Sequence, residues 1–144
     1  MNYYVNVLKN YTTFSGRARR SEYWYFALFN LIFVIVAMLL DHLLGTTFKM
    51  ETPSGQISLP YGYVYLMYVL TVFLPGLAVL VRRLHDVGKS GWFMLISLIP
   101  IVGAIWLLVL LFTDSVVGIN EYGLNPKGIG NRDEIDEIGS DMQP

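Results

Sequence analysis

Three long stretches of the chain contain no charged residue, and they dominate its hydropathy pattern. They cover residues 23–40, 61–81 and 90–113, which are 18, 21 and 24 residues long. A helix rises about 1.5 Å per residue, so about 20 apolar residues cross the roughly 30 Å hydrocarbon layer of a membrane. None of the stretches has a polar face, as a surface helix of a soluble protein would. The pattern predicts an all-α integral membrane protein with three transmembrane helices, over about 23–44, 61–81 and 91–113.

The first eleven residues follow a different, amphipathic pattern. Tyr3, Val7 and Tyr11 recur at a spacing of four, with Tyr4 and Leu8 beside them. This spacing places them on one face of a helix. We therefore predict a short interfacial amphipathic helix that precedes the first span, with Lys9 turned to water.

The composition agrees with a membrane location and limits the chemistry. Hydrophobic residues make up 54% of the chain and charged residues 15%, whereas a soluble domain has about 45–50% and about 25%. The length fits one membrane domain, residues 1–128, followed by an acidic tail, residues 129–144, that we expect to be disordered. The chain has no cysteine, so disulfides and thiolate chemistry are excluded. The net charge of −1 argues against nucleic-acid binding.

Basic residues are distributed unevenly around the spans, and this predicts the orientation. Positively charged flanks resist translocation, so the side that carries most of them is expected to be cytoplasmic. Three of the ten Lys and Arg residues lie between the first and second spans or after the third: Lys49, Lys127 and Arg132. Seven lie before the first span or between the second and third: Lys9, Arg17, Arg19, Arg20, Arg82, Arg83 and Lys89. We predict a bacterial inner-membrane protein with a cytoplasmic N-terminus and, with three spans, a C-terminus on the other side.

The third span carries an alternative. Pro100 and Gly103 lie near its middle, where proline removes a backbone donor and kinks or breaks a helix. Two half-helices could form a re-entrant hairpin instead of a full span. That arrangement would return the C-terminus to the cytoplasm.

Charged and aromatic residues crowd the predicted cytoplasmic face. The crowding predicts a surface that contacts anionic lipid headgroups or an acidic partner; an ion-pair cluster that fixes helix packing is the simpler interpretation. The candidate contact residues are Arg17, Arg19, Arg20, Glu22, Trp24, Arg82, Arg83, His85, Asp86 and Trp92.

The loop after the second span also supports local predictions. Arg82 and Asp86 stand four apart and can pair along one helix face, although Asp86 could equally take Arg17, Arg19 or Arg20. Gly88 suits a left-handed helix cap, and Ser90 can cap the start of the next helix.

Motifs for other chemistries fail. Gly88-Lys89-Ser90 resembles the end of a phosphate-binding loop, but the first glycine of that pattern would stand at Arg83. His42 and His85 fall in different loops and cannot assemble a metal site by themselves. We predict no cofactor, no metal and no catalytic residue.

Three segments together suggest a family. GRARRSEYW, RRLHDVGKSGW and GINEYGLNP, in this order around three apolar stretches, resemble the YhaH-like bacterial inner-membrane proteins (domain of unknown function 805). The resemblance covers about residues 3–126 and implies a small integral protein of the inner membrane without an established activity. By position it marks Gly16, Arg17, Arg20, Glu22, Tyr23, Trp24, Arg82, Arg83, Leu84, His85, Asp86, Ser90, Gly91, Trp92, Asn120, Tyr122, Gly123, Asn125 and Pro126.

Three functional hypotheses remain. We favour a non-enzymatic accessory, scaffold or lipid-contacting protein whose partners are anionic lipids, another membrane protein or a second copy. The rival is an oligomeric transporter or channel lined by Asn30, Thr71 and Ser97, although none of these three side chains is ionisable and able to couple protons. A lipid-phosphate enzyme with His85 as acid or base ranks last, because no nucleophile or metal set is visible.

Overall fold

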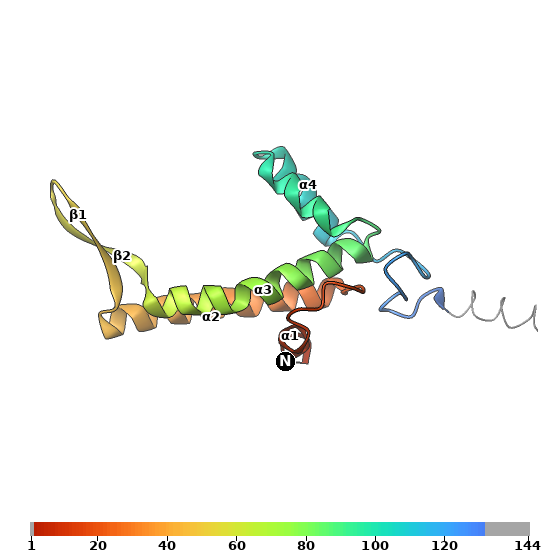
Figure 1. Ribbon diagram of the computed structural model, residues 1–144, viewed down its shortest axis with the longest axis horizontal. Coiled ribbons are helices and arrows are strands. Elements are labelled where there is room, and N and C mark those ends of the chain that lie inside the picture. The colour runs from red at the N-terminus through yellow and green to blue at the C-terminus, as the bar shows by residue number, and fades with distance from the viewer. Residues whose placement is uncertain (1, 132–144) are drawn as a thin grey trace, which may run out of the picture.

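The computed structural model describes residues 2–131 and is built around two long helices that lie side by side (Figure 1). Helix α2 runs over Arg20–Leu44 and α3 over Tyr63–Asp86, and both are long and apolar enough to cross a membrane. We call the end where α2 begins and α3 ends the arginine end, and the opposite end the strand end. Met1 and residues 132–144 lie outside the described residues, as does most of the predicted acidic tail (129–144).

The predicted N-terminal helix is present as α1, Asn2–Lys9. It crosses the α2–α3 pair near the arginine end (Figure 1). Val7 is fully buried with Phe26 and Val79, and Tyr4 stacks on Phe26 with ring centroids 5.4 Å apart. Lys9 is exposed, as predicted. The predicted helix is therefore confirmed, and Tyr4 and Val7 of its apolar face pack on α2 and α3, while the other three residues of that face stay exposed.

A strand pair joins α2 to α3, which corrects the expectation of an all-α chain. Strands β1 (Thr47–Thr52) and β2 (Gly55–Gly62) pair antiparallel. The tight turn lies between Thr52 and Gly55, and Gly55 has a φ of 125°, a conformation that favours glycine. The alternation of apolar and polar residues in this segment is short, so its sequence gives little indication of strands.

The carboxylate of Asp41 fastens the strand end together. It is fully buried near the end of α2. It accepts backbone N–H bonds from Gly62, Val64 and Tyr65 at 2.8–3.0 Å and a hydroxyl bond from Thr46 at 2.6 Å. The first N–H groups of a helix lack partners within it and favour a negative charge. Asp41 of α2 therefore caps the start of α3.

The third apolar stretch is a helical hairpin, so the expectation of one transmembrane helix over 91–113 is wrong. It forms a 3-10 helix, η1, over Gly91–Leu98 and a separate helix, α4, over Val102–Phe112. Pro100 lies between them, where its missing N–H and its ring oppose a continuous helix. A Cβ on Gly103 would overlap the backbone of Ile96, so glycine allows the two legs to approach closely.

The hairpin also determines where residues 114–131 lie. It rises from the arginine end and returns to it (Figure 1), and Val116 N–H donates to Asp86 O at 3.0 Å. Residues 114–131, which we call the C-terminal strap, therefore lie at the same end as α1. The alternative topology raised from Pro100 and Gly103 matches this geometry, and the three-span topology does not.

We predict that labelling of single cysteines will reveal this topology in a membrane. Thr12→Cys and Glu121→Cys should react together with an impermeant maleimide from one side, and Ser54→Cys from the other, because all three positions are exposed and only Ser54 lies at the strand end. The natural chain has no cysteine to interfere. Reaction of Glu121→Cys on the same side as Ser54→Cys would restore the three-span topology.

The role of Asp41 can be tested by exchanging its charge. Asp41→Asn keeps the size but turns an NH₂ group toward backbone donors, and we expect the apparent Tm in detergent to fall by about 5 °C. His42→Asn is the matched control, because His42 is its exposed neighbour and should change the Tm little. Equal Tm values for the two variants would refute the cap.

Candidate functional site

The densest polar cluster lies inside the arginine end. We call it the arginine network: Arg17, Glu22, Arg82, Arg83 and Asp86. Arg83 and Asp86 are fully buried, and the other three are at most 9% exposed. Buried charges are costly unless they are paired and hydrogen-bonded. Their contacts therefore show what this cluster does.

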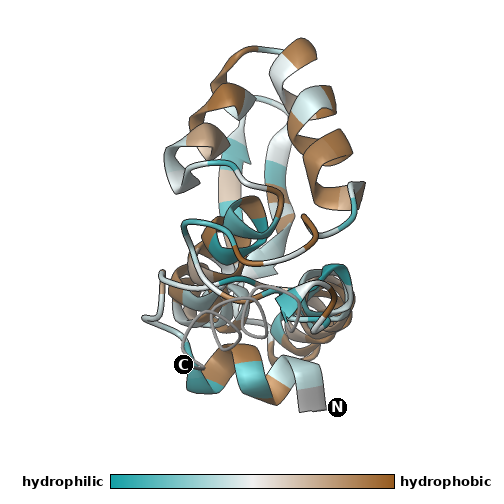
Figure 2. Ribbon diagram, turned by 90° about the vertical axis from the view of Figure 1, so that its right-hand side faces the viewer, coloured by the Kyte–Doolittle hydropathy of each residue, from teal (hydrophilic) through white to brown (hydrophobic). Residues whose placement is uncertain are grey.

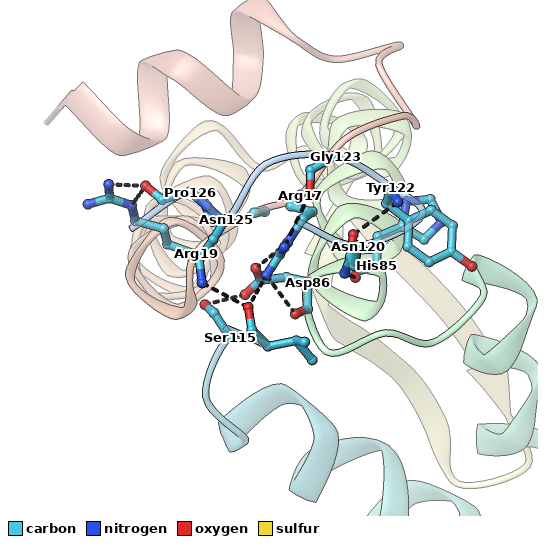
Figure 3. Close-up of polar contacts among 12 residues, drawn as sticks. Arg17, Arg19, His85, Asp86, Ser115, Asn120, Tyr122, Gly123, Asn125 and Pro126 are labelled. Carbon is cyan, nitrogen blue, oxygen red and sulfur yellow. Dashed lines mark hydrogen bonds and ion pairs between the residues drawn. The ribbon is translucent and has the colours of Figure 1, made fainter. Parts of the chain in front are cut away.

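Asp86 is the centre of the network (Figure 3). Its Oδ1 lies 3.0 Å from Arg17 Nε, and its Oδ2 pairs with Arg83 Nη1. Ser115 Oγ of the strap donates to Oδ2 at 2.6 Å. One carboxylate thus joins the segment before α2, the end of α3 and the strap. Of the partners offered for Asp86 in sequence analysis, Arg17 is confirmed.

Arg82 forms a separate pair, which corrects the predicted bond to Asp86. Its Nη1 lies 3.0 Å from Glu22 Oε1, between α3 and α2. Among the described residues its Nε and Nη2 have no hydrogen-bond partner. Unsatisfied buried donors cost about 1–3 kcal/mol. The cluster therefore holds three arginines against two carboxylates, and other groups must solvate the extra charge.

Backbone carbonyls at the end of α4 accept hydrogen bonds from the arginines and so help to solvate their charge. Arg83 donates to Leu111 O at 3.3 Å and also to Thr113 O. Trp24 Nε1 donates to Leu111 O at 3.4 Å, and Arg20 Nη1 donates to Phe112 O at 3.1 Å. The last carbonyls of a helix lack partners within it and carry partial negative charge. Side chains from α2 and α3 therefore cap α4 across the molecule.

Other arginines hold the strap (Figure 3). Arg17 donates to Val116 O at 2.6 Å and to Gly118 O at 2.8 Å, and Arg19 donates to Pro126 O. Asn125, which is 3% exposed, donates to Val116 O at 2.8 Å. The strap is thus held mainly through its backbone. This explains what the GINEYGLNP segment does in the fold.

His85 also contacts the strap. Its ring stacks on Tyr122 with centroids 3.8 Å apart and planes 3° apart. Its Nδ1 lies 3.2 Å from Gly16 O, and because a carbonyl only accepts, Nδ1 must carry the proton. Its carbonyl accepts from Asn120 Nδ2 at 2.9 Å. These contacts give His85 a positioning role between the N-terminal segment and the strap.

Two of the remaining candidates, Arg20 and Trp92, lie at the surface of the arginine end. Together with Lys9, Tyr25 and Lys89, which were not candidates, they form what we call the exposed rim. Trp92 is 75% exposed, Arg20 keeps 45% of its side chain exposed, and Lys89 is exposed beside Phe93. Trp92 also lines an open groove of about 330 Å³ between Phe14 and α3. Direct headgroup contact by Arg17, Arg82 and Arg83 does not match their burial. The structure thus divides the predicted set into an internal network and an exposed rim.

An exposed pair lies beside this rim. Asp114 pairs with Lys127 and lies 3.8 Å from Arg20 Nε. The hydrogen bond from Lys127 holds the pKa of Asp114 below its ordinary value. This pair tethers the two ends of the strap at the surface, where such ion pairs contribute little to stability.

The polar residues proposed for a transport path do not gather. Asn30 Oδ1 accepts from Tyr68 OH at 2.5 Å, between α2 and α3. Thr71 and Ser97 each bond the backbone of their own helix, at Met67 O and Met94 O. Within one copy of the described chain, each polar group is satisfied locally. Among residues 2–131 no three His, Cys, Asp or Glu side chains form a group that could hold a metal ion.

Sequence reasoning missed the backbone partners of the arginines and the cap at Asp41. Carbonyl acceptors have no residue type, so no motif marks them. Asp41 carried a usable signal, since it is a single acid at the end of an apolar stretch. A charge in that place needs a partner at the same depth, and the start of the next helix supplies one.

Comparison with known proteins identifies the family. The model of the family described as Protein of unknown function (DUF805) matches residues 11–124. The chain belongs to the DUF805 family. It is 43% identical to Inner membrane protein YhaH of Escherichia coli (strain K12), over 88% of this chain and 98% of that protein. It is 42% identical to Inner membrane protein YhaI of the same strain, over 88% and 97%. No solved structure matches it. The resemblance noted in the sequence is confirmed.

The match to DUF805 covers both partners of the central ion pairs. Residues 11–124 include the whole arginine network, the hairpin and most of the strap. The relatives are named as inner membrane proteins, which agrees with the two helices long enough to cross a membrane. The family places the chain among membrane proteins and leaves the activity to be proposed.

We predict that Asp86 is required for folding in this DUF805 protein. Asp86→Asn leaves the guanidinium groups of Arg17 and Arg83 buried without their countercharge, which costs about 3–5 kcal/mol. The yield of folded protein in detergent, measured by size-exclusion chromatography, should fall several-fold. Asp114→Asn is the control, because it removes an exposed carboxylate of the same region and should fold normally. Equal yields for the two variants would contradict a central role for Asp86.

Proposed function

We propose that this protein is a non-enzymatic, lipid-contacting component of the bacterial inner membrane. In this proposal α2 and α3 cross the membrane, the hairpin enters it from one side, and the arginine end faces the cytoplasm. The names of the relatives support the membrane. The supporting observation for lipid contact is the exposed rim of cations and aromatic rings that remains after the buried network is set aside.

The distribution of basic residues supports the orientation. Of the nine Lys and Arg in residues 2–131, eight lie at the arginine end and only Lys49 lies at the strand end. The hairpin produces this asymmetry, because it brings Lys127 to the same side as the others. Basic flanks remain in the cytoplasm. The excess of basic residues on one side is therefore larger with the hairpin than with three spans, and it supports a cytoplasmic arginine end.

The exposed cations and aromatic rings of the arginine end support contact with anionic headgroups. Lys9, Arg20 and Lys89 are exposed at the arginine end. Trp92 and Tyr25 are 75% and 49% exposed there. Tyr and Trp rings favour the membrane interface, and each basic residue near an anionic surface contributes about 1 kcal/mol. The rim therefore suits the cytoplasmic headgroup layer, where such lipids carry negative charge.

The buried network supports a scaffold role over an enzymatic one. Arg17, Arg83 and Asp86 use their polar atoms on one another and on backbone carbonyls. His85 is occupied by Gly16 and Tyr122. Groups bonded in this way hold segments in place. They are not poised to transfer a proton to a lipid.

Stabilisation by anionic lipid tests the proposal. Phosphatidylglycerol added to the detergent-purified protein should raise the apparent Tm more than phosphatidylcholine does. In a variant with Lys9→Gln and Lys89→Gln we expect most of this difference to disappear, because about 2 kcal/mol of attraction is removed. The Tm without lipid should stay close to that of the natural chain.

Lys49→Gln is the matched control, since it removes an exposed cation at the strand end. It should keep the full response to phosphatidylglycerol. An undiminished response in the double variant, or an equal loss in Lys49→Gln, would contradict the proposed contact surface.

A further inference from the structure

We propose that the protein is wedge-shaped, wider at its arginine end, and that it prefers curved membranes in which the leaflet around that end is expanded. The protein would bind no separate ligand in this role. It would respond to the extra area per lipid that curvature creates in one leaflet. The inference rests on the membrane placement proposed above. It does not depend on the charge of the headgroups.

The depth of the hairpin is the first support. Helix η1 has eight residues and α4 has eleven. At about 2.0 Å and about 1.5 Å per residue, each leg is about 16 Å long. This matches one leaflet, which is half of the roughly 30 Å hydrocarbon layer. Because η1 begins and α4 ends at the arginine end, the hairpin can fill the leaflet on that side and not the other leaflet.

The surface of the hairpin is the second support. Its tip residues Leu98 and Ile101 are each 76% exposed, and Val102 is 65% exposed. Within the described chain only Gly103 and Leu111 of the two legs are buried. The carbonyls at the end of α4 are capped by Arg83, Trp24 and Arg20. The hairpin therefore presents to its surroundings an apolar surface that acyl chains would cover.

Helix α1 adds to the same leaflet. Its ring contacts fall on residues 25–33 of α2, at the arginine end. In both ribbon views α1 lies on one side of the α2–α3 pair and the hairpin on the opposite side (Figures 1 and 2). An amphipathic helix inserted in one leaflet responds to curvature. Both additions therefore widen the same half of the molecule.

The strand end has no such additions in the described chain. Leu77 and Val81 of α3 line one groove together with Trp92 and Met94 of the hairpin, and both positions lie beyond the middle of α3. At the other end only α2 and α3 continue, and they lead to the exposed strands β1 and β2. The cross-section is thus wide in one leaflet and narrow in the other. Such a shape is accommodated with less strain where the first leaflet is expanded.

The test uses both orientations of the same protein. Purified chain carrying Thr12→Cys or Ser54→Cys is reconstituted into giant vesicles and labelled from outside with an impermeant dye. Dye on Thr12→Cys marks molecules with the arginine end outward, and dye on Ser54→Cys marks the reverse orientation. A narrow tube is then pulled from each vesicle, which expands the outer leaflet of the tube. The measured quantity is protein density in the tube relative to a lipid dye.

We expect a tube-to-vesicle ratio above one for the Thr12→Cys label and below one for the Ser54→Cys label. The two ratios should keep their order in phosphatidylcholine alone and with one third phosphatidylglycerol added. Equal ratios for the two orientations would overturn the wedge. An orientation difference seen only with phosphatidylglycerol would also overturn it and would support headgroup charge alone. Because the cysteine labels report the placement separately, failure of the wedge is distinguishable from failure of the membrane proposal.

Discussion

The last carbonyl groups of α4 have no partners within their helix, and the arrangement of the arginine end depends on how they are bonded. A buried helix end without other partners would leave several acceptors unsatisfied, at a cost of about 1–3 kcal/mol each. Arg83, Trp24 and Arg20 donate to them from α2 and α3. Once those bonds hold α4 at the arginine end, the hairpin must turn back, and the strap must begin beside Asp86.

The two ends of the α2–α3 pair solve one physical problem with opposite charges. At the strand end a single buried carboxylate, Asp41, accepts from the N–H groups that start α3. At the arginine end guanidinium groups donate to the carbonyls that finish α4. Each charge lies where the helix dipole favours it. Arginine is suited to the second task because its planar group offers five donors in a fixed geometry.

Much of this fold could be predicted from residue patterns. The two long apolar helices, α1, the left-handed cap at Gly88 and the Ser90 cap follow from local rules, and the structure contains each of them. The hairpin could be raised only as an alternative, because Pro100 weakens a helix without saying where the second leg goes. The partner of Arg82 was misassigned, because Glu22 lies 60 residues away in the chain, whereas Arg17 could be offered for Asp86 only as one of several arginines. Spacing within a helix carries no information about such contacts, and carbonyl acceptors leave no trace in the sequence.

The bonds from Arg17 to the strap have a consequence for biosynthesis. They join residues separated by about 100 positions in the chain, Arg17 with Val116 and with Gly118. Since a chain is made from its N-terminus, α2 and α3 are complete before the acceptors exist. Until the strap emerges, the guanidinium of Arg17 can pair with Asp86 but lacks these carbonyl acceptors. The arginine end is thus the last part of the protein to close, and a chain truncated before residue 116 would leave part of its central charge without the backbone groups that solvate it.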